Sequence, residues 1–508
     1  MYQALLTRRY LTSKVMPLLA ALAVMLCTAM VLIVWSVMGG FLVMLMESGR
    51  TLIGDVSISS PGTGFAYYDD LIKRLEADPA VDAATPMIEG YGLLQLPASS
   101  GPETVVIKGV DGPSFERVTS YASTLWWRPL DKPLPKDAKR QDPRLSPDRR
   151  EEFARFFAEG STLTARSRAG DPVGAMVLGV EVGGYNARQV EGWYSPVVFL
   201  PGDTATLSVL PLDRRGRVIP DQATKVLPIA NHFRSGLYDI DANTVLVRLD
   251  VLQKLLKMEA TAAIDPSTRA ASVTSRDPAT GRESFNQPAA TRLAPARITH
   301  VLVRAKSGID ADTLRDRCKA VYREFQRAHA ADFDPPPPEG GGVRILTWRD
   351  RNMTLIAAVE KEIYLVLFIF GIISLTAVFL VLAIFWAMVS EKTKDIGILR
   401  AIGAGRLGVA WLWLRYGLAI GVVGSALGGA TALLIIANIN PIHEWLGRNL
   451  HVTVWDPRVY YFNEIPSRFE PLKAAIVLAG GVLASVAGAL VPAVKAARMD
   501  PIRALRFE

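Results

Sequence analysis

Motifs for nucleotide hydrolysis, metal binding and disulfide bonding are missing from this 508-residue sequence. No segment fits GxxxxGK[ST], the loop whose backbone amides and lysine hold phosphates. The two cysteines cannot form a framework, because Cys27 lies in an apolar run and Cys318 in a polar region. None of the five histidines stands in an HExxH pattern. We therefore expect no catalytic site and no cofactor or metal bound by this chain, and any energy for its work must come from another subunit.

A nucleic-acid-binding role is also not expected, although the net charge is +8. The basic residues form no single patch, and many flank apolar runs, where they act as topology signals. Half of the residues are apolar while 21% are charged. That mixture is typical of a few membrane helices joined to a polar folded domain.

Four apolar runs are long enough to span a bilayer, which needs about 20 residues. The expected transmembrane helices cover residues 16–46, 363–389, 412–437 and 474–494, the first with an extension beyond the bilayer. The first run is too long for the core of a signal peptide and no small-x-small cleavage site ends it, so we expect it to be retained.

Basic residues predict the orientation of these helices. Residues 1–15, 390–406 and 495–508 carry clustered lysine and arginine, which the positive-inside rule places in the cytoplasm. We therefore expect a multi-pass protein of the bacterial inner membrane with both termini cytoplasmic. Residues 47–350 and the shorter loop 439–473 are then periplasmic.

The long segment 47–350 is expected to fold as an α+β domain inserted between the first and second helices. Strand-like runs occur at 55–59, 104–110, 204–209, 243–249 and 300–305, and helix-like runs at 68–77, 251–258 and 311–328. Two polar stretches near 129–170 and 263–297 are interpreted as mobile insertions.

The short segment 390–406 reads SEKTKDIGILRAIGAGR. We expect an amphipathic helix with Ile396, Leu399 and Ile402 on one face. Two interpretations stay open: a helix lying on the lipid surface, or an apolar edge that docks into a groove on a cytoplasmic partner. The GxGxxG match that begins at Gly403 follows a helix, so it predicts a turn and not a dinucleotide site.

Small residues recur at helical spacing in the third apolar run, and this predicts close helix packing. The glycines are Gly417, Gly421, Gly424 and Gly428.

The first run continues without a polar break as far as residue 46. A helix that carries apolar side chains beyond the bilayer must pack against the second span or bind an apolar ligand such as an acyl chain. Both interpretations stay open. The residues concerned are Met38, Phe41, Met44, Leu45, Tyr364 and Phe368.

Several stretches resemble the permeases of bacterial lipoprotein-releasing ABC transporters, within a superfamily that includes macrolide-exporter and cell-division permeases. They are SVMGGF at 36–41, KGVD at 108–111, FRSGLYD at 233–239, Trp348 with Asn352, the segment 391–405, and VPAVKAARMDPIRALR at 491–506. The segment 391–405 is similar to the superfamily's coupling segment, which gives ATPase-coupling roles to Glu391, Lys392, Asp395, Ile396, Leu399, Arg400 and Gly403.

This resemblance implies a mechanism and a set of partners. A second permease and a cytoplasmic ABC ATPase dimer, which binds ATP and Mg, would complete the complex. The complex would lift a lipoprotein out of the outer leaflet of membrane lipid by mechanotransmission and pass it to a periplasmic carrier. The stretch 208–225 is either a plain surface hairpin or a hook for that carrier, with Arg217, Val218, Ile219 and Pro220 at its tip. A macrolide-type efflux permease and a regulator of cell-wall hydrolases are the alternatives.

Overall fold

The computed structural model describes residues 15–50, 52–97, 99, 101–130, 144, 147–166, 170–184, 186–188, 194–196, 200–213, 216–264, 273–276, 283–285, 291–450 and 465–505. The chain divides into two compact units. The helical unit lies within residues 1–44, 354–460 and 464–508, and the α+β domain is essentially residues 45–353.

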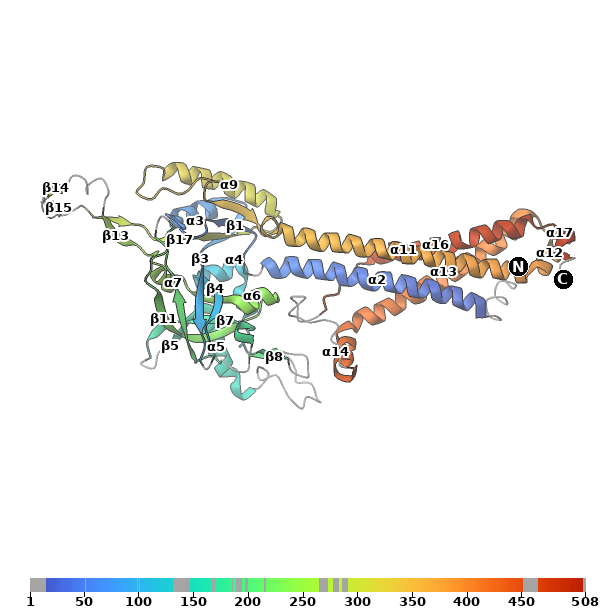
Figure 1. The fold of residues 1–508 in the computed structure, drawn as a ribbon, viewed down its shortest axis with the longest axis horizontal. Helices are drawn as coiled ribbons and strands as arrows, with labels where there is room; N and C mark the ends of the chain where they lie inside the picture. The colour runs from blue at the N-terminus through green and yellow to red at the C-terminus, as the bar shows by residue number, and fades with distance from the viewer. Residues whose placement is uncertain are drawn as a thin grey trace. The chain divides into compact units, whose positions relative to one another are not determined.

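Four long helices dominate the helical unit (Figure 1): α2 (Val15–Arg50), α11 (Met353–Glu391), α13 (Arg406–Ala437) and α16 (Pro471–Arg498). Each contains an apolar stretch of 28 to 36 residues, more than the roughly 20 that cross a bilayer. The four expected spans lie within these helices. Three short helices accompany them: α12 (Thr393–Ala401), α14 (Ile439–Leu450) and α17 (Pro501–Leu505).

Small and aromatic side chains form the core of the helical unit. Ala20, Phe385, Ile420 and Ala489, one from each long helix, are fully buried. Between α14 and α16, residues 451–464 of the expected loop 439–473 lie outside the described residues, as do residues 1–14 and 506–508.

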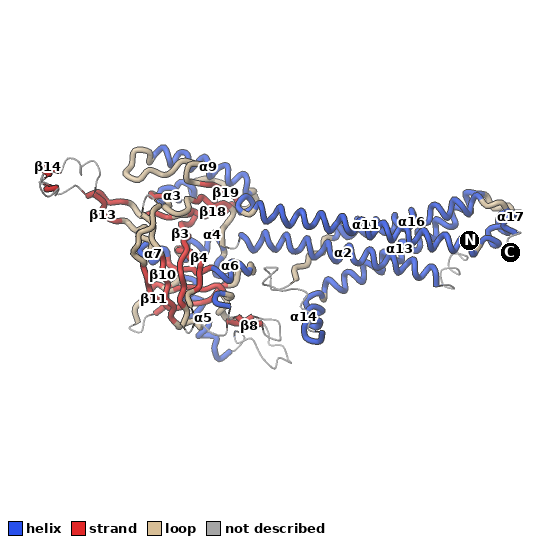
Figure 2. Tube along the Cα trace, viewed as in Figure 1, coloured by secondary structure: helices blue, strands red, loops and turns tan. Residues whose placement is uncertain are grey.

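A nine-stranded mixed sheet organises the α+β domain (Figure 2), in the order β10-β11-β7-β12-β4-β3-β18-β1-β19. Its pairs are antiparallel except β11–β7 and β12–β4, and β10 also pairs with β3. The strands are β1 (Val56–Ser59), β3 (Val81–Gln95), β4 (Glu103–Val110), β7 (Met176–Gly179), β10 (Thr204–Val209), β11 (Ala223–Phe233), β12 (Thr244–Arg248), β18 (His300–Ala305) and β19 (Arg344–Thr347).

Helices cover both faces of this sheet because its strands bury side chains on each side. One core includes Leu71 of α3 (Tyr68–Ala77), Leu252 of α7 (Leu249–Leu255) and Phe325 of α9 (Ala311–Ala328). The other includes Phe115 of α4 (Gly112–Thr119) and Leu163, which follows α5 (Arg150–Thr162). The described part of this domain also contains α6 (Tyr238–Asn243) and α10 (Trp348–Arg351), with 3-10 turns at Tyr121–Thr124, Pro147–Arg149 and Val182–Gly184.

Within the described residues, five strand pairs form outside the large sheet. They are β2 (Phe65–Ala66) with β17 (Arg297–Ile298), β5 (Thr164–Arg166) with β6 (Pro172–Gly174), β8 (Asn186–Arg188) with β9 (Tyr194–Pro196), β13 (Thr261–Ile264) with β16 (Thr291–Ala294), and β14 (Val273–Arg276) with β15 (Glu283–Phe285).

The first expected insertion, 129–170, contains regular structure in its second half. Helix α5 packs into the domain through Phe153 and Phe156, and the Phe153 ring stacks on Trp127 with centroids 5.6 Å apart. The spacing of its aromatic residues places them on one helical face, which outweighs the polar composition. Residues 131–143, 145–146 and 167–169 lie outside the described part.

The second expected insertion, 263–297, also contains regular structure. The β13–β16 and β14–β15 pairs belong to it, and Arg297 at its end is buried. Residues 265–272, 277–282 and 286–290 are outside the described part.

Candidate functional site

The segment between α11 and α13 is a short helix, as the sequence predicts, held between two long ones. Helix α11 ends at Glu391, α12 covers Thr393–Ala401 and α13 begins at Arg406. Gly403 has a φ of 103°, a left-handed conformation that suits glycine and ends α12. Any force on α12 therefore acts at the adjacent ends of both long helices.

The apolar face of α12 differs from the one expected. Ile396 is buried and Leu399 half-buried, but Ile402 is 80% exposed. Ile402 continues the helical turn, because its amide donates to the Ile398 carbonyl at 3.1 Å, and it lies on the exposed side with Ile398, whereas Ile396 packs with Val409 of α13. The outward apolar side chains at this end are Ile398, Ile402 and Leu407. Sequence reasoning did not single out Ile398 or Leu407.

One ion pair forms within the segment 390–406. Lys392 Nζ lies 2.8 Å from Asp395 Oδ2, an i,i+3 ion pair, and Glu391 is exposed. The Arg400 Nε is buried and has no hydrogen-bond acceptor among the described residues. Helix α17 packs on α12, and the Asp500 carboxylate accepts a hydrogen bond from the Ile502 amide at its start.

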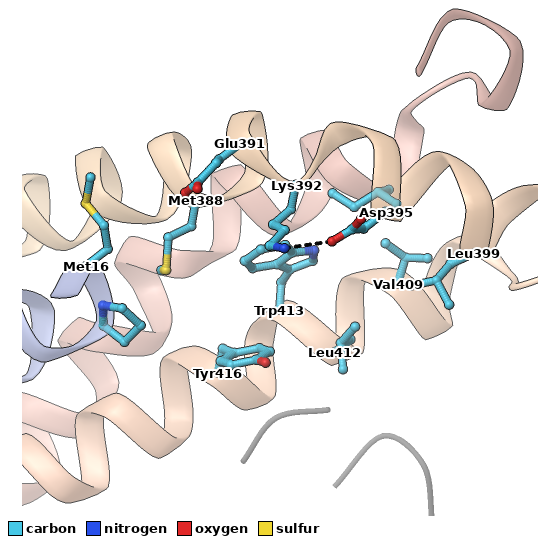
Figure 3. A pocket seen from close by; sticks show the side chains of 12 residues that line it. Met16, Met388, Glu391, Lys392, Asp395, Leu399, Val409, Leu412, Trp413 and Tyr416 are labelled. Atoms are coloured by element: carbon cyan, nitrogen blue, oxygen red, sulfur yellow. Dashed lines mark hydrogen bonds and ion pairs between the residues drawn. The ribbon is translucent and has the colours of Figure 1, made fainter. Parts of the chain in front are cut away.

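A pocket of about 60 Å³ opens beside α12 (Figure 3). Apolar side chains from all four adjoining segments line it, together with the Lys392–Asp395 pair. The lining residues are Met16, Pro17, Met388, Glu391, Lys392, Asp395, Ile396, Leu399, Val409, Leu412, Trp413 and Tyr416. Five of the seven residues with an expected coupling role line this pocket; Arg400 and Gly403 do not.

The four expected packing glycines all lie at helix crossings. A Cβ on Gly421 would lie 2.9 Å from Ser485 Cβ of α16, and one on Gly417 would also overlap α16, at Ala489. A Cβ on Gly424 would lie 2.8 Å from the Ala21 carbonyl oxygen of α2, and Gly428 meets α2 as well. The four glycines therefore contact two neighbouring helices. Gly417 and Gly421 contact α16, and Gly424 and Gly428 contact α2.

The residues expected to pack on the second span or to bind an apolar ligand are only partly covered by other residues of this chain. Met38, Phe41 and Met44 of α2 are half-buried, whereas Tyr364 and Phe368 of α11 are 71% and 67% exposed. The Leu45 side chain lies outside the described part.

The motif around residues 36–41 has a packing role that the sequence did not reveal. The Arg468 amide donates to the Ser36 carbonyl at 3.1 Å, and a Cβ on Gly40 would lie 2.9 Å from Ser467 Cα. The glycine thus lets the chain before α16 approach α2 closely.

The hairpin expected at 208–225 is present as the β10–β11 connection, apart from residues 214 and 215, which lie outside the described part. Arg217 pairs with Asp213 at 2.8 Å and the Ile219 amide donates to the Pro211 carbonyl. Val218 and Pro220 are exposed. Val218 also lines a groove of about 710 Å³ that sequence reasoning missed, together with Tyr91, Glu89, His300 and Arg351, among others.

The KGVD stretch holds the domain together. Lys108 and Glu89 are cross-strand partners whose charged atoms are 4.0 Å apart, and Arg351 lies 3.4 Å from Glu89. Burial acts to raise the pKa of Glu89, but the nearby positive charges outweigh it and hold the pKa below its ordinary value. Gly109 leaves room for Leu252, and the Asp111 side chain accepts from the Ser114 amide to cap α4.

The FRSGLYD stretch folds around an aspartate just beyond it. Buried Asp241 accepts hydrogen bonds from the Ser235 amide and hydroxyl, at 2.7 and 2.8 Å, and from the Gly236 amide. Burial raises the pKa of Asp241 to about 7, against the lowering effect of these bonds. Sequence reasoning missed Asp241 because it lies two residues past the motif.

Among the described residues, no group of three or more His, Cys, Asp or Glu side chains could hold a metal ion. The candidate site consists of a short helix, the two long helices joined to it, and glycine contacts that pack α13 against α16 and α2.

Residues 367–501 match the family described as FtsX-like permease C-terminal. That stretch begins inside α11, passes through α12 and α13 and ends at the start of α17, so it contains α12 and the adjoining ends of α11 and α13. The C-terminal part of this chain is therefore similar to FtsX-like permeases, and the described residues include four helices long enough to span a membrane, with an α+β domain between the first two.

The sequence relatives bear the name that the resemblance suggested. The "Lipoprotein-releasing system transmembrane protein LolC" of Xylella fastidiosa (strain 9a5c) is 24% identical over 33% of this chain and 41% of its own length. The LolC protein of Neisseria meningitidis serogroup B is 25% identical over 44% of this chain and 52% of its own length. The resemblance to lipoprotein-releasing permeases is thus confirmed, although the chain spans about half or less of these relatives.

A LolE protein of Haemophilus influenzae (strain Rd) is 26% identical over 23% of this chain and 28% of its own length. Among solved structures, the periplasmic region of MacB from Actinobacillus actinomycetemcomitans covers 60% of this chain and 95% of its own, at 9% identity and a TM-score of 0.26.

Proposed function

We propose that this chain is a non-catalytic permease subunit of an ABC transporter that releases lipoproteins from the outer leaflet of the bacterial inner membrane. In this proposal a separate ATPase dimer binds ATP and Mg and moves α12. The long helices transmit that movement, and the α+β domain passes the cargo to a periplasmic carrier.

The observation that carries the proposal is the position of α12, with Ile398 and Ile402 exposed, between the adjacent ends of α11 and α13. Exposed apolar side chains on a short helix suit a groove on a partner protein. Relatives named as lipoprotein-releasing transmembrane proteins support the cargo class. The separate names LolC and LolE support a pairing of two permeases.

The energetics of the cargo support an external energy source. Each methylene moved out of hydrocarbon costs about 0.8 kcal/mol, so a lipoprotein with several acyl chains is held firmly. The exposed side chains of Tyr364 and Phe368 need a covering surface, which a second permease or the acyl chains would supply.

The test is to purify the complex from its native membrane and identify the co-purifying proteins by mass spectrometry. We expect an ABC ATPase, a second permease copy and a triacylated lipoprotein. Recovery of the ATPase with a periplasmic adaptor and no lipoprotein would favour macrolide-type efflux, and recovery with a cell-wall hydrolase regulator would favour the cell-division role. Either result would contradict the proposal.

A further inference from the structure

Helix α14 carries apolar side chains that the other described residues leave exposed. Ile442 and Trp445, one turn apart, are 40% and 57% exposed, and Leu450 at the end of the helix is 57% exposed. Helical spacing places the two charged residues of α14, Glu444 and Arg448, on the side away from Ile442. This separation of apolar and charged residues is typical of a helix that lies at a boundary between water and an apolar phase.

The start of α14 lies at the end of a membrane span. The apolar stretch of α13 runs to Ala437, and α14 begins at Ile439. Figure 1 shows α14 turned away from the direction of the long helices. Its 12 residues extend about 18 Å, which is too short to cross a bilayer. When α13 spans the membrane, α14 therefore begins at the level of the bilayer surface.

Hydrogen bonds hold α14 at this level from a second direction. The Asn440 side-chain oxygen accepts from the Ile465 amide at 2.9 Å, and the Asn440 Nδ2 donates to the Ile465 carbonyl oxygen at 3.5 Å. Ile465 comes shortly before α16, which begins at Pro471. The first turn of α14 is thus connected to two spans, which keeps it close to the bilayer surface.

The surroundings of α14 favour lipid as the occupant of its exposed side. Leu433 and Leu434, in the last part of the α13 span, are 46% and 67% exposed. Lipid that surrounds these side chains also reaches α14, which starts a few residues later. Tryptophan is enriched where lipid meets water, because its ring is apolar and its N–H is polar. The exposed Trp445 therefore suits this boundary.

We propose that α14 binds the lipid surface at which α13 emerges, with the Ile442, Trp445 and Leu450 side chains among the upper acyl-chain methylenes. In the orientation proposed above, this is the surface of the outer leaflet. Burial of apolar side chains provides the interaction, so it requires no particular headgroup. This inference goes beyond the proposed function, because neither an ATPase nor a cargo takes part in it.

The experiment is spin labelling of the full-length protein in phosphatidylcholine vesicles, whose zwitterionic headgroups exclude attraction by net charge. In a Cys27→Ser background, one label is attached at Ile442→Cys. The matched control on the opposite side of α14 is Gly447→Cys, where an added Cβ meets nothing within 4 Å. Collisions with oxygen, which dissolves in hydrocarbon, are compared with collisions with a water-soluble nickel chelate. We expect oxygen to dominate at Ile442→Cys and the nickel chelate at Gly447→Cys.

Two further positions calibrate the measurement. Leu434→Cys on α13 reports the lipid environment, and Val226→Cys on β11 reports water. Adding Trp445→Ser to Ile442→Cys should shift its label toward the nickel chelate, while the protein elutes in size-exclusion chromatography as the unaltered protein does.

Equal access of the nickel chelate to Ile442→Cys and Gly447→Cys would overturn the inference. Exclusion of both reagents from Ile442→Cys would also overturn it, because protein would then cover this side of α14. No ATPase or lipoprotein is present in the vesicles, so either result leaves the proposed function to be judged by its own test.

Discussion

Single buried polar residues determine how the α+β domain responds to pH and to substitution. Buried His232 accepts the Trp127 Nε1–H at 3.1 Å through its Nδ1, and burial lowers the pKa of His232 to about 3. Buried Asp241 has its pKa raised to about 7. Folding therefore keeps the histidine uncharged and favours the protonated form of the aspartate.

These two groups contribute to stability with opposite signs. A histidine with a depressed pKa contributes stability above its unfolded value of about 6.5, and this is lost as the pH falls toward 3. An aspartate with a raised pKa contributes stability below about 3.8, and this is lost as the pH rises through 7. Each group changes the unfolding free energy by about 1.4 kcal/mol per pH unit inside its window.

We predict that His232→Asn reduces the acid sensitivity of the protein. Asparagine keeps an acceptor for Trp127 but cannot take up a proton. The fall in melting temperature between pH 6.5 and pH 5, measured by scanning fluorimetry, should be smaller than in the unaltered protein. An unchanged fall would contradict the assignment of His232 as a buried neutral group.

The cross-strand pair of Glu89 and Lys108 makes a second residue-level prediction. Lys108→Met leaves the buried Glu89 with Arg351 as its remaining cation, and should destabilise the α+β domain by about 3 kcal/mol in denaturant unfolding. The double variant Lys108→Met with Glu89→Leu should recover most of that loss. If the double variant is no better than the single one, the two charges are not coupled.

At the scale of whole elements, α13 is held by backbone contact with two neighbours. We predict that Gly421→Ala weakens the helical unit, because the new Cβ would meet Ser485 at 2.9 Å. Overpacking of this kind costs about 1–3 kcal/mol. Gly371→Ala in α11 is the matched control, since its Cβ meets nothing within 4 Å. Thermal unfolding in detergent should separate the two variants, and equal melting temperatures would show that the crossing tolerates a methyl group.

The exposed side of α12 gives the next prediction. Ile402→Asp should lower ATPase co-purification at least ten-fold, because a charge replaces an apolar contact at the proposed interface. Val226→Asp changes an exposed residue of β11 and serves as the control. Normal recovery of the ATPase with Ile402→Asp would place the partner contact elsewhere.

Long periodic elements were predictable from the sequence and interrupted ones were not. The helices at 68–77 and 311–328 and the strands at 204–209 and 300–305 were predicted with the bounds observed. Strand β3 was missed because Pro86, Gly90 and Gly92 interrupt its pattern. The sheet accepts Gly92 where a Cβ would collide with the Ser208 carbonyl. Such close contacts depend on partners far away in the sequence.

The position of the candidate site could be predicted from the sequence, but which side chains of α12 are buried and which are exposed could not. The length of the segment between two apolar runs located α12, whereas the inward turn of Ile396 depends on where α12 ends. Asp241 was missed for a similar reason. Its significance lies in the Ser235 and Gly236 groups that it meets after folding, and no spacing rule reports that.

At the scale of the whole molecule, we propose that this chain transmits force passively from one side of a membrane to the other. This requires α12 and the α+β domain to lie on opposite sides. Two positions suit a direct test, since Ile402 is 80% and Val226 60% exposed. The native Cys318 interferes little, because it is buried and burial raises its thiol pKa to about 12.

The decisive measurement is labelling of Ile402→Cys and Val226→Cys, in a Cys27→Ser background, with a membrane-impermeant maleimide on cells whose outer membrane has been opened. The account predicts that Val226→Cys is labelled at once and that Ile402→Cys is labelled only after the inner membrane is permeabilised. Labelling of both positions from the same side, or of Ile402→Cys alone in sealed cells, would contradict it.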